Sequence, residues 1–162
     1  MTIANTVVQG TYSGNGSTVD FAIPFDYQNA SEILVYLRNE NVNPATEVLQ
    51  TITTNYTLTG GTPATLVTMN VAPATGYKLI IVRVTPKTQE ADYITNGEFP
   101  AETHEQVLDK LTQEVQELGN EILKTLRFNI TSAQSNKRIP DPVAGGVFAW
   151  DGTGTNITYI TQ

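Results

Sequence analysis

The stretch HEQVLDKLTQEVQELGNEILKTL, residues 104–126, is the one long segment of this chain whose apolar residues recur at helical spacing. With Leu108 at heptad position a, these residues alternate between steps of three and four along the predicted helix. The resulting seam consists of Leu108, Leu111, Val115, Leu118, Ile122 and Thr125. A helix docked on a globular core usually has a wider apolar face, so this narrow seam favours a coiled coil.

Two ways of burying the seam are open: packing on the chain's own preceding domain, or self-association. Each buried Leu or Ile contributes roughly 1.5–3 kcal/mol, whereas Gly119 inside the helix costs about 1 kcal/mol relative to Ala. A coil of about three heptads is marginal in water by itself, so we expect the preceding domain to join the self-association. Val and Ile at a with Leu at d favour two strands, but Leu108 and Thr125 break that pattern, which leaves dimer and trimer open.

The residues before the helix are expected to form strands. In VDFAIPF, one face of a half-buried strand carries Val19, Phe21, Ile23 and Phe25. Asn15-Gly16 predicts a hairpin that joins this strand to one near Thr6–Tyr12. The segments Glu32–Glu40 and Tyr77–Pro86 are apolar at consecutive positions, as strands covered on both faces would be. TLVTMNVAP alternates through Val67, Met69 and Val71. Turn residues recur at a spacing that is typical of an antiparallel β-sandwich.

These patterns predict a mainly β protein with four parts. We expect a β-sandwich-like domain over residues 1–90, a connector over 91–102, a coiled-coil helix over 103–128, and a linker with a short β element over 129–162. Thr103 and Gln106 suggest a capping box at the start of the helix. In the last part, Asp151-Gly152 resembles a hairpin turn between two short apolar runs.

Composition argues against several classes of partner. The formal net charge is −7, which is unfavourable for binding nucleic acid or an anionic membrane. The chain has no cysteine, so neither disulfides nor thiolate metal sites are expected. Its start, MTIANTVVQG, lacks the pattern of a secretory signal, and no apolar run reaches transmembrane length. We therefore expect a soluble protein made without secretory export.

Residues with catalytic potential are few and scattered. His104 is the only histidine, and the heptad frame places it at d, at the mouth of the seam. The carboxylates that fall in predicted turns are Asp92, Glu98, Asp141 and Asp151. No nucleophile motif, phosphate-binding loop or metal-ligand spacing accompanies them. We therefore predict no catalytic, cofactor-binding or metal site, and no enzyme activity.

Three segments in order, VDFAIPFDYQNASEILVYL, NYTLTGG and GYKLIIVRVTPKTQEADYITNGEFPAETHEQVLDKLTQEVQEL, resemble a known family. They are similar to the N-terminal virion-anchoring domain of podovirus (autographivirus-type) phage tail fibres and tailspikes, and the resemblance spans about Thr11 to Leu118. It implies a homotrimeric β domain that docks onto the adaptor and nozzle proteins of the tail, with the helix leading into the fibre shaft. It also implies location in the virion after synthesis in the bacterial host's cytoplasm.

One departure from the family leaves alternatives open. The long receptor-binding or depolymerase region that normally follows such an anchor does not follow here. We therefore expect either a piece of a longer fibre or a short adaptor onto which a second fibre or tailspike docks. The runner-up function is a β-sandwich module that binds a host receptor or glycan. The aromatic residues available for stacking on sugar would be Tyr12, Tyr27, Tyr36, Tyr56 and Trp150.

Overall fold

The computed structural model describes residues 3–89, 91, 100–125, 144–153 and 157–161. The chain divides into two compact units, residues 1–124 and 125–162. The first unit contains two antiparallel sheets and one long helix, and the second contains a two-stranded antiparallel sheet. The prediction of a mainly β protein with one helix and a small C-terminal β element is confirmed for the described residues.

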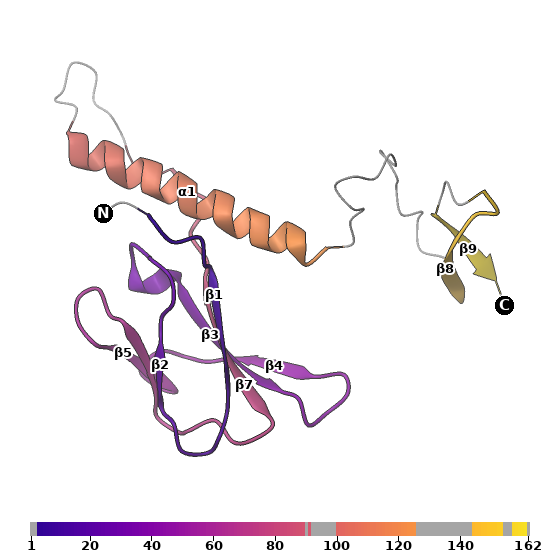
Figure 1. The fold of residues 1–162 in the computed structure, drawn as a ribbon, viewed down its shortest axis with the longest axis horizontal. Coiled ribbons are helices and arrows are strands. Elements are labelled where there is room, and N and C mark those ends of the chain that lie inside the picture. The colour runs from indigo at the N-terminus through magenta and orange to yellow at the C-terminus, as the bar shows by residue number, and fades with distance from the viewer. Residues whose placement is uncertain (1–2, 90, 92–99, 126–143, 154–156, 162) are drawn as a thin grey trace. The chain divides into compact units, whose positions relative to one another are not determined.

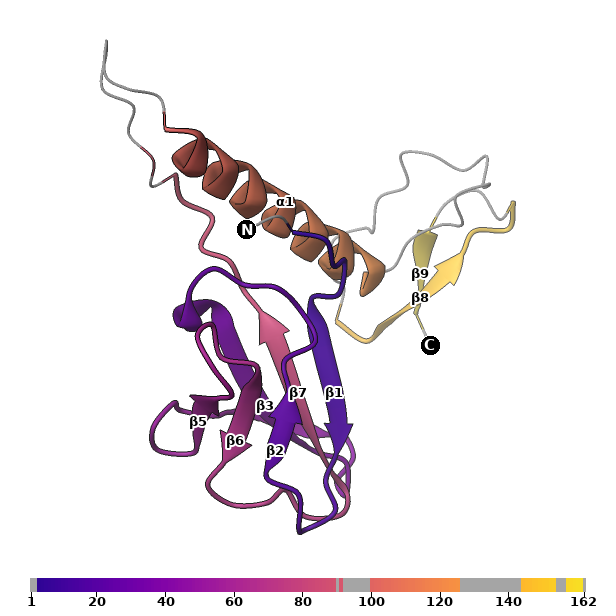
Figure 2. The same cartoon turned by 60° about the vertical axis from the view of Figure 1, so that its left-hand side comes forward.

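Two sheets face each other in the first unit (Figures 1 and 2). The larger sheet has the order β1-β7-β3-β4, formed by β1 (Gln9–Ser13), β7 (Tyr77–Arg83), β3 (Ile33–Asn39) and β4 (Thr46–Leu49). The smaller has the order β2-β6-β5, formed by β2 (Asp20–Ala22), β6 (Leu66–Met69) and β5 (Tyr56–Thr59). A 3-10 turn, η1 (Ala30–Glu32), leads into β3.

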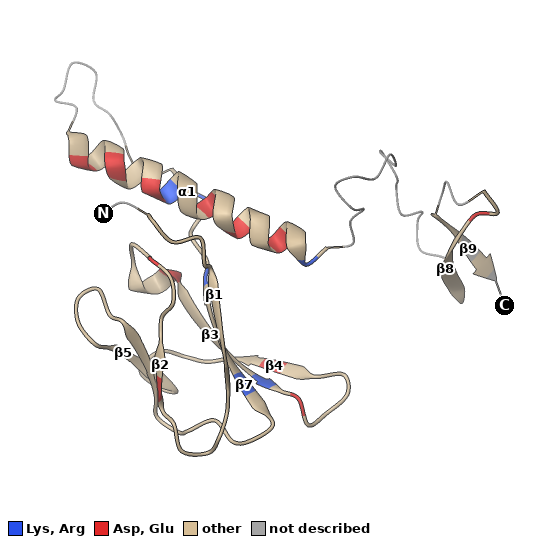
Figure 3. Ribbon diagram, viewed as in Figure 1, with Lys and Arg blue, Asp and Glu red and all other residues tan. Residues whose placement is uncertain are grey.

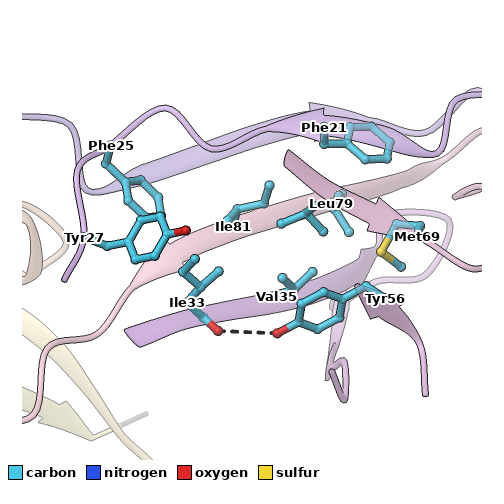
Figure 4. Close-up of a cluster of buried hydrophobic side chains, with 10 residues drawn as sticks. Phe21, Phe25, Tyr27, Ile33, Val35, Tyr56, Met69, Leu79 and Ile81 are labelled. Carbon is cyan, nitrogen blue, oxygen red and sulfur yellow. Dashed lines mark hydrogen bonds between the residues drawn. The ribbon is translucent and has the colours of Figure 1, made fainter. Parts of the chain in front are cut away.

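The hydrophobic core lies between these sheets (Figure 4). Ile33, Val35, Leu79 and Ile81 come from the larger sheet, and Phe21, Tyr56, Val67 and Met69 from the smaller. The face predicted from VDFAIPF is confirmed, because Phe21 and Phe25 are buried while Val19 and Ile23 pack partly buried against them. The strand ends at Ala22, just before Pro24, which cannot donate to a ladder.

The predicted hairpin between the first two strands is wrong. β1 pairs with β7, with Thr11 opposite Ile80, and β2 pairs with β6. Gly16 does make a turn with a φ of 74°, but this turn carries the chain from one sheet to the other. The reason is that both strands contribute to the core: the rings of Tyr12 and Phe21 contact each other with centroids 5.4 Å apart, so the strands face each other instead of pairing.

The expectation that β3 and β7 are covered on both faces is also wrong. Along β7, Leu79, Ile81 and Arg83 are buried, whereas the residues between them are only half-buried. A sandwich has a single core between its sheets, so the outer face of each sheet stays accessible to solvent. Val71, expected to continue the buried face of β6, is exposed because that strand ends at Met69.

The helix α1 (Ala101–Leu123) begins two residues earlier than predicted. Its N-cap is Pro100, which makes no side-chain capping bond, so Thr103 lies within the first turn and the predicted capping box is wrong. Proline fixes a backbone φ of −65° at this position, and Ala101 after it has the highest helix propensity of all residues. The helix ends where the backbone N–H of Lys124 caps the last turn. Residues 126–128 of the predicted helix lie outside the described residues.

The second unit is built on β8 (Gly146–Trp150) and β9 (Ile157–Thr161). They pair antiparallel with Trp150 opposite Ile157, so residues 151–156 connect them. The connection is therefore longer than the two-residue turn expected at Asp151-Gly152. The Thr153 hydroxyl donates to Oδ1 of Asp151 at 2.8 Å, which orders the start of this loop.

Candidate interaction surface

Helix α1 lies against its own β domain (Figure 1). It uses its polar face for this contact. Its buried residues are Asp109, Gln113 and Glu117. These fall at heptad positions b, f and c, on the side of the helix opposite the seam. Helix α1 therefore does not project away from the sheets, because hydrogen bonds between polar groups hold it in place.

Arg83 is the centre of this contact. It follows Leu79 and Ile81 on the inward face of β7, and its side chain is fully buried. Its guanidinium Nη1 donates to the backbone oxygen of Asp26 at 2.6 Å, and Nη2 donates to Oε1 of Gln116 at 2.9 Å. The guanidinium also lies 6.0 Å from the centre of the Phe25 ring, a distance at which a cation is attracted to a ring face. The inward face of β7 therefore ends in a buried positive charge, which needs an acidic partner on helix α1.

Glu117 satisfies that charge from the helix. Its Oε1 accepts from Nε of Arg83 at 2.9 Å and from the Thr85 hydroxyl at 2.6 Å, while Oε2 accepts from the Thr85 backbone N–H at 2.9 Å. Both partners of the ion pair are nearly inaccessible, with 0% and 6% of their side chains exposed. A buried charge is tolerated only when it is paired and hydrogen-bonded. This Arg83–Glu117–Thr85 group, which we call the clip, fixes one face of α1 against the sheet.

Further polar contacts extend along α1 on both sides of the clip. The N-terminal segment contributes the backbone N–H of Ile3, which donates to Oδ1 of Asp109 at 3.2 Å, and the backbone oxygen of Asn5, which accepts from Nε2 of Gln116 at 3.0 Å. Near the helix end, Nζ of Lys124 donates to Oε1 of Gln9 at 2.8 Å. The helix is therefore held along most of its length, and its rotation about its own axis is set.

The seam predicted from the sequence points to solvent. The described subunit exposes Leu108, Leu111, Val115, Leu118 and Ile122 by 47% to 69% of their surface. Thr125, just beyond the helix, is exposed as well. We call these six residues the ridge. The ordinary arrangement of an amphipathic helix is thus inverted, with polar groups buried against the sheets and apolar groups facing water. The acidic residues of α1 are spread along its length (Figure 3).

The structure does not bring the candidate catalytic residues together. His104 is exposed in the first turns of α1, and Asp151 lies in the second unit. Asp92, Glu98 and Asp141 are outside the described residues. In the part of the chain that the structure describes, no group of three or more His, Cys, Asp or Glu residues could hold a metal ion. No helix among those residues is long and apolar enough to cross a membrane.

The aromatic residues considered for sugar stacking do not form a platform. Tyr27 and Tyr56 are buried in the core, where their hydroxyls donate to the backbone oxygens of Ala64 and Ile33. Burial raises the pKa of both phenols and that of Tyr12, which packs on Phe21. Trp150 is half-exposed but belongs to the second unit. Most of these rings therefore stabilise the sandwich.

Comparison with known proteins assigns the chain to a family. Residues 1–116 match the model of the phage T7 tail fibre protein N-terminal domain. The chain belongs to this family. The match runs from the N-terminal segment through both sheets and ends inside α1, next to Glu117.

A tail spike protein of Salmonella phage epsilon15 is 36% identical over 129 residues. The aligned region is 78% of this chain but only 12% of that tail spike protein. The resemblance to tail fibre and tailspike N-terminal domains inferred from the sequence is thus confirmed, and the chain is a structural component of phage tails.

Sequence reasoning missed the clip. A signal was present, because the alternation of inward residues along β7 continues from Leu79 and Ile81 to Arg83 and Thr85. An arginine on the inward face of a strand requires an acidic partner in the interior. The sequence does not show which glutamate is the partner of Arg83, because this depends on how helix α1 lies on the sheets.

Proposed function

We propose that the chain forms a homotrimer through the ridge of α1 and attaches a tail fibre or tailspike to the phage tail. The observation that carries this proposal is the orientation of α1. Its polar face is buried against the β domain, while its apolar ridge is left in water. Leaving such a row of large apolar side chains in solvent is unfavourable, and contiguous apolar surface of this kind marks protein interaction sites.

The trimer interface consists of Leu108, Leu111, Val115, Leu118, Ile122 and Thr125. These residues alternate at the three-and-four spacing that lets a residue of one helix insert between four residues of its neighbour. Burying the five apolar members would contribute roughly 1.5–3 kcal/mol each if burial were complete. Three copies are proposed because of the threefold symmetry that membership of this family implies.

The β domain supplies the contact with the tail. We propose the adaptor and nozzle proteins as its partners, with the chain located in the virion after synthesis in the bacterial cytoplasm. The proposed function of the chain is mechanical and needs no cofactor, metal or nucleic acid. Because the chain covers a small part of the length of the tail spike protein it matches, receptor-binding or depolymerase activity would belong to regions downstream, or to a second fibre or tailspike docked on this one.

The test of the trimer is light scattering on the purified chain, for which we expect three subunits. The variant Leu111→Asp/Leu118→Asp should be monomeric, because each charge would have to enter the dry centre of the coil. Leu123→Asp is the matched control, since Leu123 is an exposed apolar residue of the same helix that lies off the ridge. This control should remain trimeric.

The same variants test attachment when they are introduced into the full-length fibre gene and particles are assembled. Leu111→Asp/Leu118→Asp should abolish incorporation of the fibre, and Leu123→Asp should not. A monomeric or dimeric parent chain, or normal incorporation of the double variant, would contradict the proposal.

A further inference from the structure

We propose that the α1 helices of the assembly run parallel at its centre and that each β domain is held outside this bundle, on the outer face of its own helix, by the clip. This inference rests on the proposed self-association and adds the arrangement of the subunits. The anchor would then be a central bundle surrounded by three β domains, in contrast to β domains stacked above a projecting stalk.

Helix α1 has two opposite faces, one apolar and one polar. Ridge residues occupy heptad positions a and d. The residues buried against the sheets, Asp109, Gln113 and Glu117, occupy b, f and c. In a coiled coil, a and d face the axis and b, c and f face outward. A β domain attached to the outward positions can stay in place while the ridge is buried, so no contact with the sheets has to break on assembly.

The residues beside the ridge fit a second copy of the same helix. In a parallel coil, position g of one helix lies beside position e of the next heptad in its neighbour. Here Glu114 would face Gly119, and Val107 would face Thr112. Gly119 has no atom within 4 Å of the place where a Cβ would stand, so its side of the helix is open to a neighbour. No glutamate meets another in these pairs, and an acidic helix can therefore associate with copies of itself.

Antiparallel association is disfavoured by the same charges. It sets g positions beside g positions, so that Glu114 would lie next to the identical glutamate when two helices overlap fully. Like charges in such positions are unfavourable and determine orientation in coiled coils. The flanks of the ridge thus fit a second copy of this chain in the same direction.

The clip fixes the rotation of α1 about its own axis and thereby the position of the β domain. Glu117 is fixed through three hydrogen bonds, and Arg83 is held from both the helix and the Asp26 backbone. Contacts of Asp109 and Gln116 with the N-terminal segment add to this. Rotation of α1 about its axis would break the buried pair, so the β domain cannot turn into the position of the ridge. In the assembly, the ends of the sheets that lie away from α1 (Figure 2) would face outward.

Cysteine substitutions test the direction of the helices, since the chain contains no cysteine of its own. Leu108→Cys and Ile122→Cys each place one thiol at position a, near opposite ends of the ridge. In a parallel bundle identical positions meet at the axis, so both variants should form intersubunit disulfides under mild oxidation and run as covalent dimers on a denaturing gel. Leu123→Cys, next to Ile122 but at position b, should not. Failure of both ridge variants to cross-link in a trimer would overturn the parallel arrangement.

Isotope-resolved cross-linking tests whether each β domain stays on its own helix. Nζ of Lys87 lies 3.8 Å from Oε1 of Glu121, within one subunit, so a zero-length carbodiimide can join them. Trimers are refolded from an equal mixture of unlabelled and fully ¹⁵N-labelled chains, cross-linked and digested. We expect cross-linked peptide pairs in which both halves carry the same isotope. Pairs of mixed isotope content would show that the β domain sits on a neighbour's helix, and would overturn the inference.

Different results would overturn the proposed function and the placement of the β domains. A monomer in light scattering removes the proposed function and this inference together. A trimer that gives mixed-isotope pairs leaves the proposed function intact and removes only the placement of the β domains, whereas a trimer that lacks ridge disulfides also contradicts the ridge as its interface. The disulfides at both ends of the ridge together with pure-isotope pairs would place the helices at the centre and the β domains outside.

Discussion

The clip makes a sharp prediction for Glu117→Gln. The glutamine side chain keeps the size of glutamate but loses its charge and replaces one acceptor oxygen with an NH₂ group. In either orientation of the amide, that NH₂ group faces a donor, because one carboxylate oxygen of Glu117 accepts from Arg83 and the other from the Thr85 backbone N–H. The Arg83 charge then stays buried without a counter-charge. Breaking a buried ion pair in this way costs about 3–5 kcal/mol.

Urea unfolding is the appropriate assay, and the monomeric Leu111→Asp/Leu118→Asp background keeps it independent of protein concentration. With a denaturant slope of about 1–3 kcal/mol/M, a loss of this size lowers the urea midpoint by roughly 2 M. Glu121→Gln is the control: it removes a carboxylate from the same helix whose side chain is 62% exposed beside Lys87. Exposed pairs of this kind are worth about 0–1 kcal/mol.

An equal urea midpoint for Glu117→Gln and Glu121→Gln would refute this reasoning.

A third variant separates the effect of charge from that of packing. Arg83→Met/Glu117→Leu removes both charges, and replacement of a buried pair by apolar residues is often neutral. We therefore expect the double variant to be more stable than Glu117→Gln alone. If it is less stable, the hydrogen bonds of the clip matter more than its unpaired charge.

Four further predictions concern the sandwich and the helix. Leu79→Ala should lower the free energy of unfolding by about 2–5 kcal/mol in urea titrations, because Leu79 is fully buried. Stability measured between pH 8 and 12 should hold below about pH 10, the usual phenol pKa. It should then fall as pH rises through the raised folded-state pKa values of Tyr27 and Tyr56. Gly119→Ala should raise the thermal midpoint by removing a helix penalty of about 1 kcal/mol. Gly14→Ala should lower it, since its Cβ would clash with the backbone oxygen of Ala74.

Much of the β domain could be predicted because strand alternation is a local property. The inward face of Phe21 and Phe25 follows from the period of apolar residues, and the strand character of β3 and β7 was predicted from their runs of consecutive apolar residues. Strand pairing did not follow, because Asn15-Gly16 favours a local hairpin while the burial of Phe21 against β1 and β7 requires a change of sheet. A preference for a turn does not decide which strands it joins.

The candidate interaction surface was predicted in part. The ridge could be read from its spacing alone, since residues three and four apart share one face of any helix. The predicted start of the helix, Thr103, was two residues too late, because α1 begins at Ala101 after the N-cap Pro100. The position of the helix on the sheets was not predicted, because packing through buried polar groups leaves no apolar periodicity to detect.

An antiparallel β domain followed by a helix with a narrow apolar seam could be predicted from the sequence, because both patterns depend on the spacing of residues along one element. Which side of that helix meets the sheets depends on contacts between residues that are far apart in the chain. Arg83, at the inward end of β7, must keep its charge paired away from water, and Glu117 is the acid that reaches it. Because this ion pair holds the polar face of α1 against the sheets, the ridge on the opposite face points to solvent.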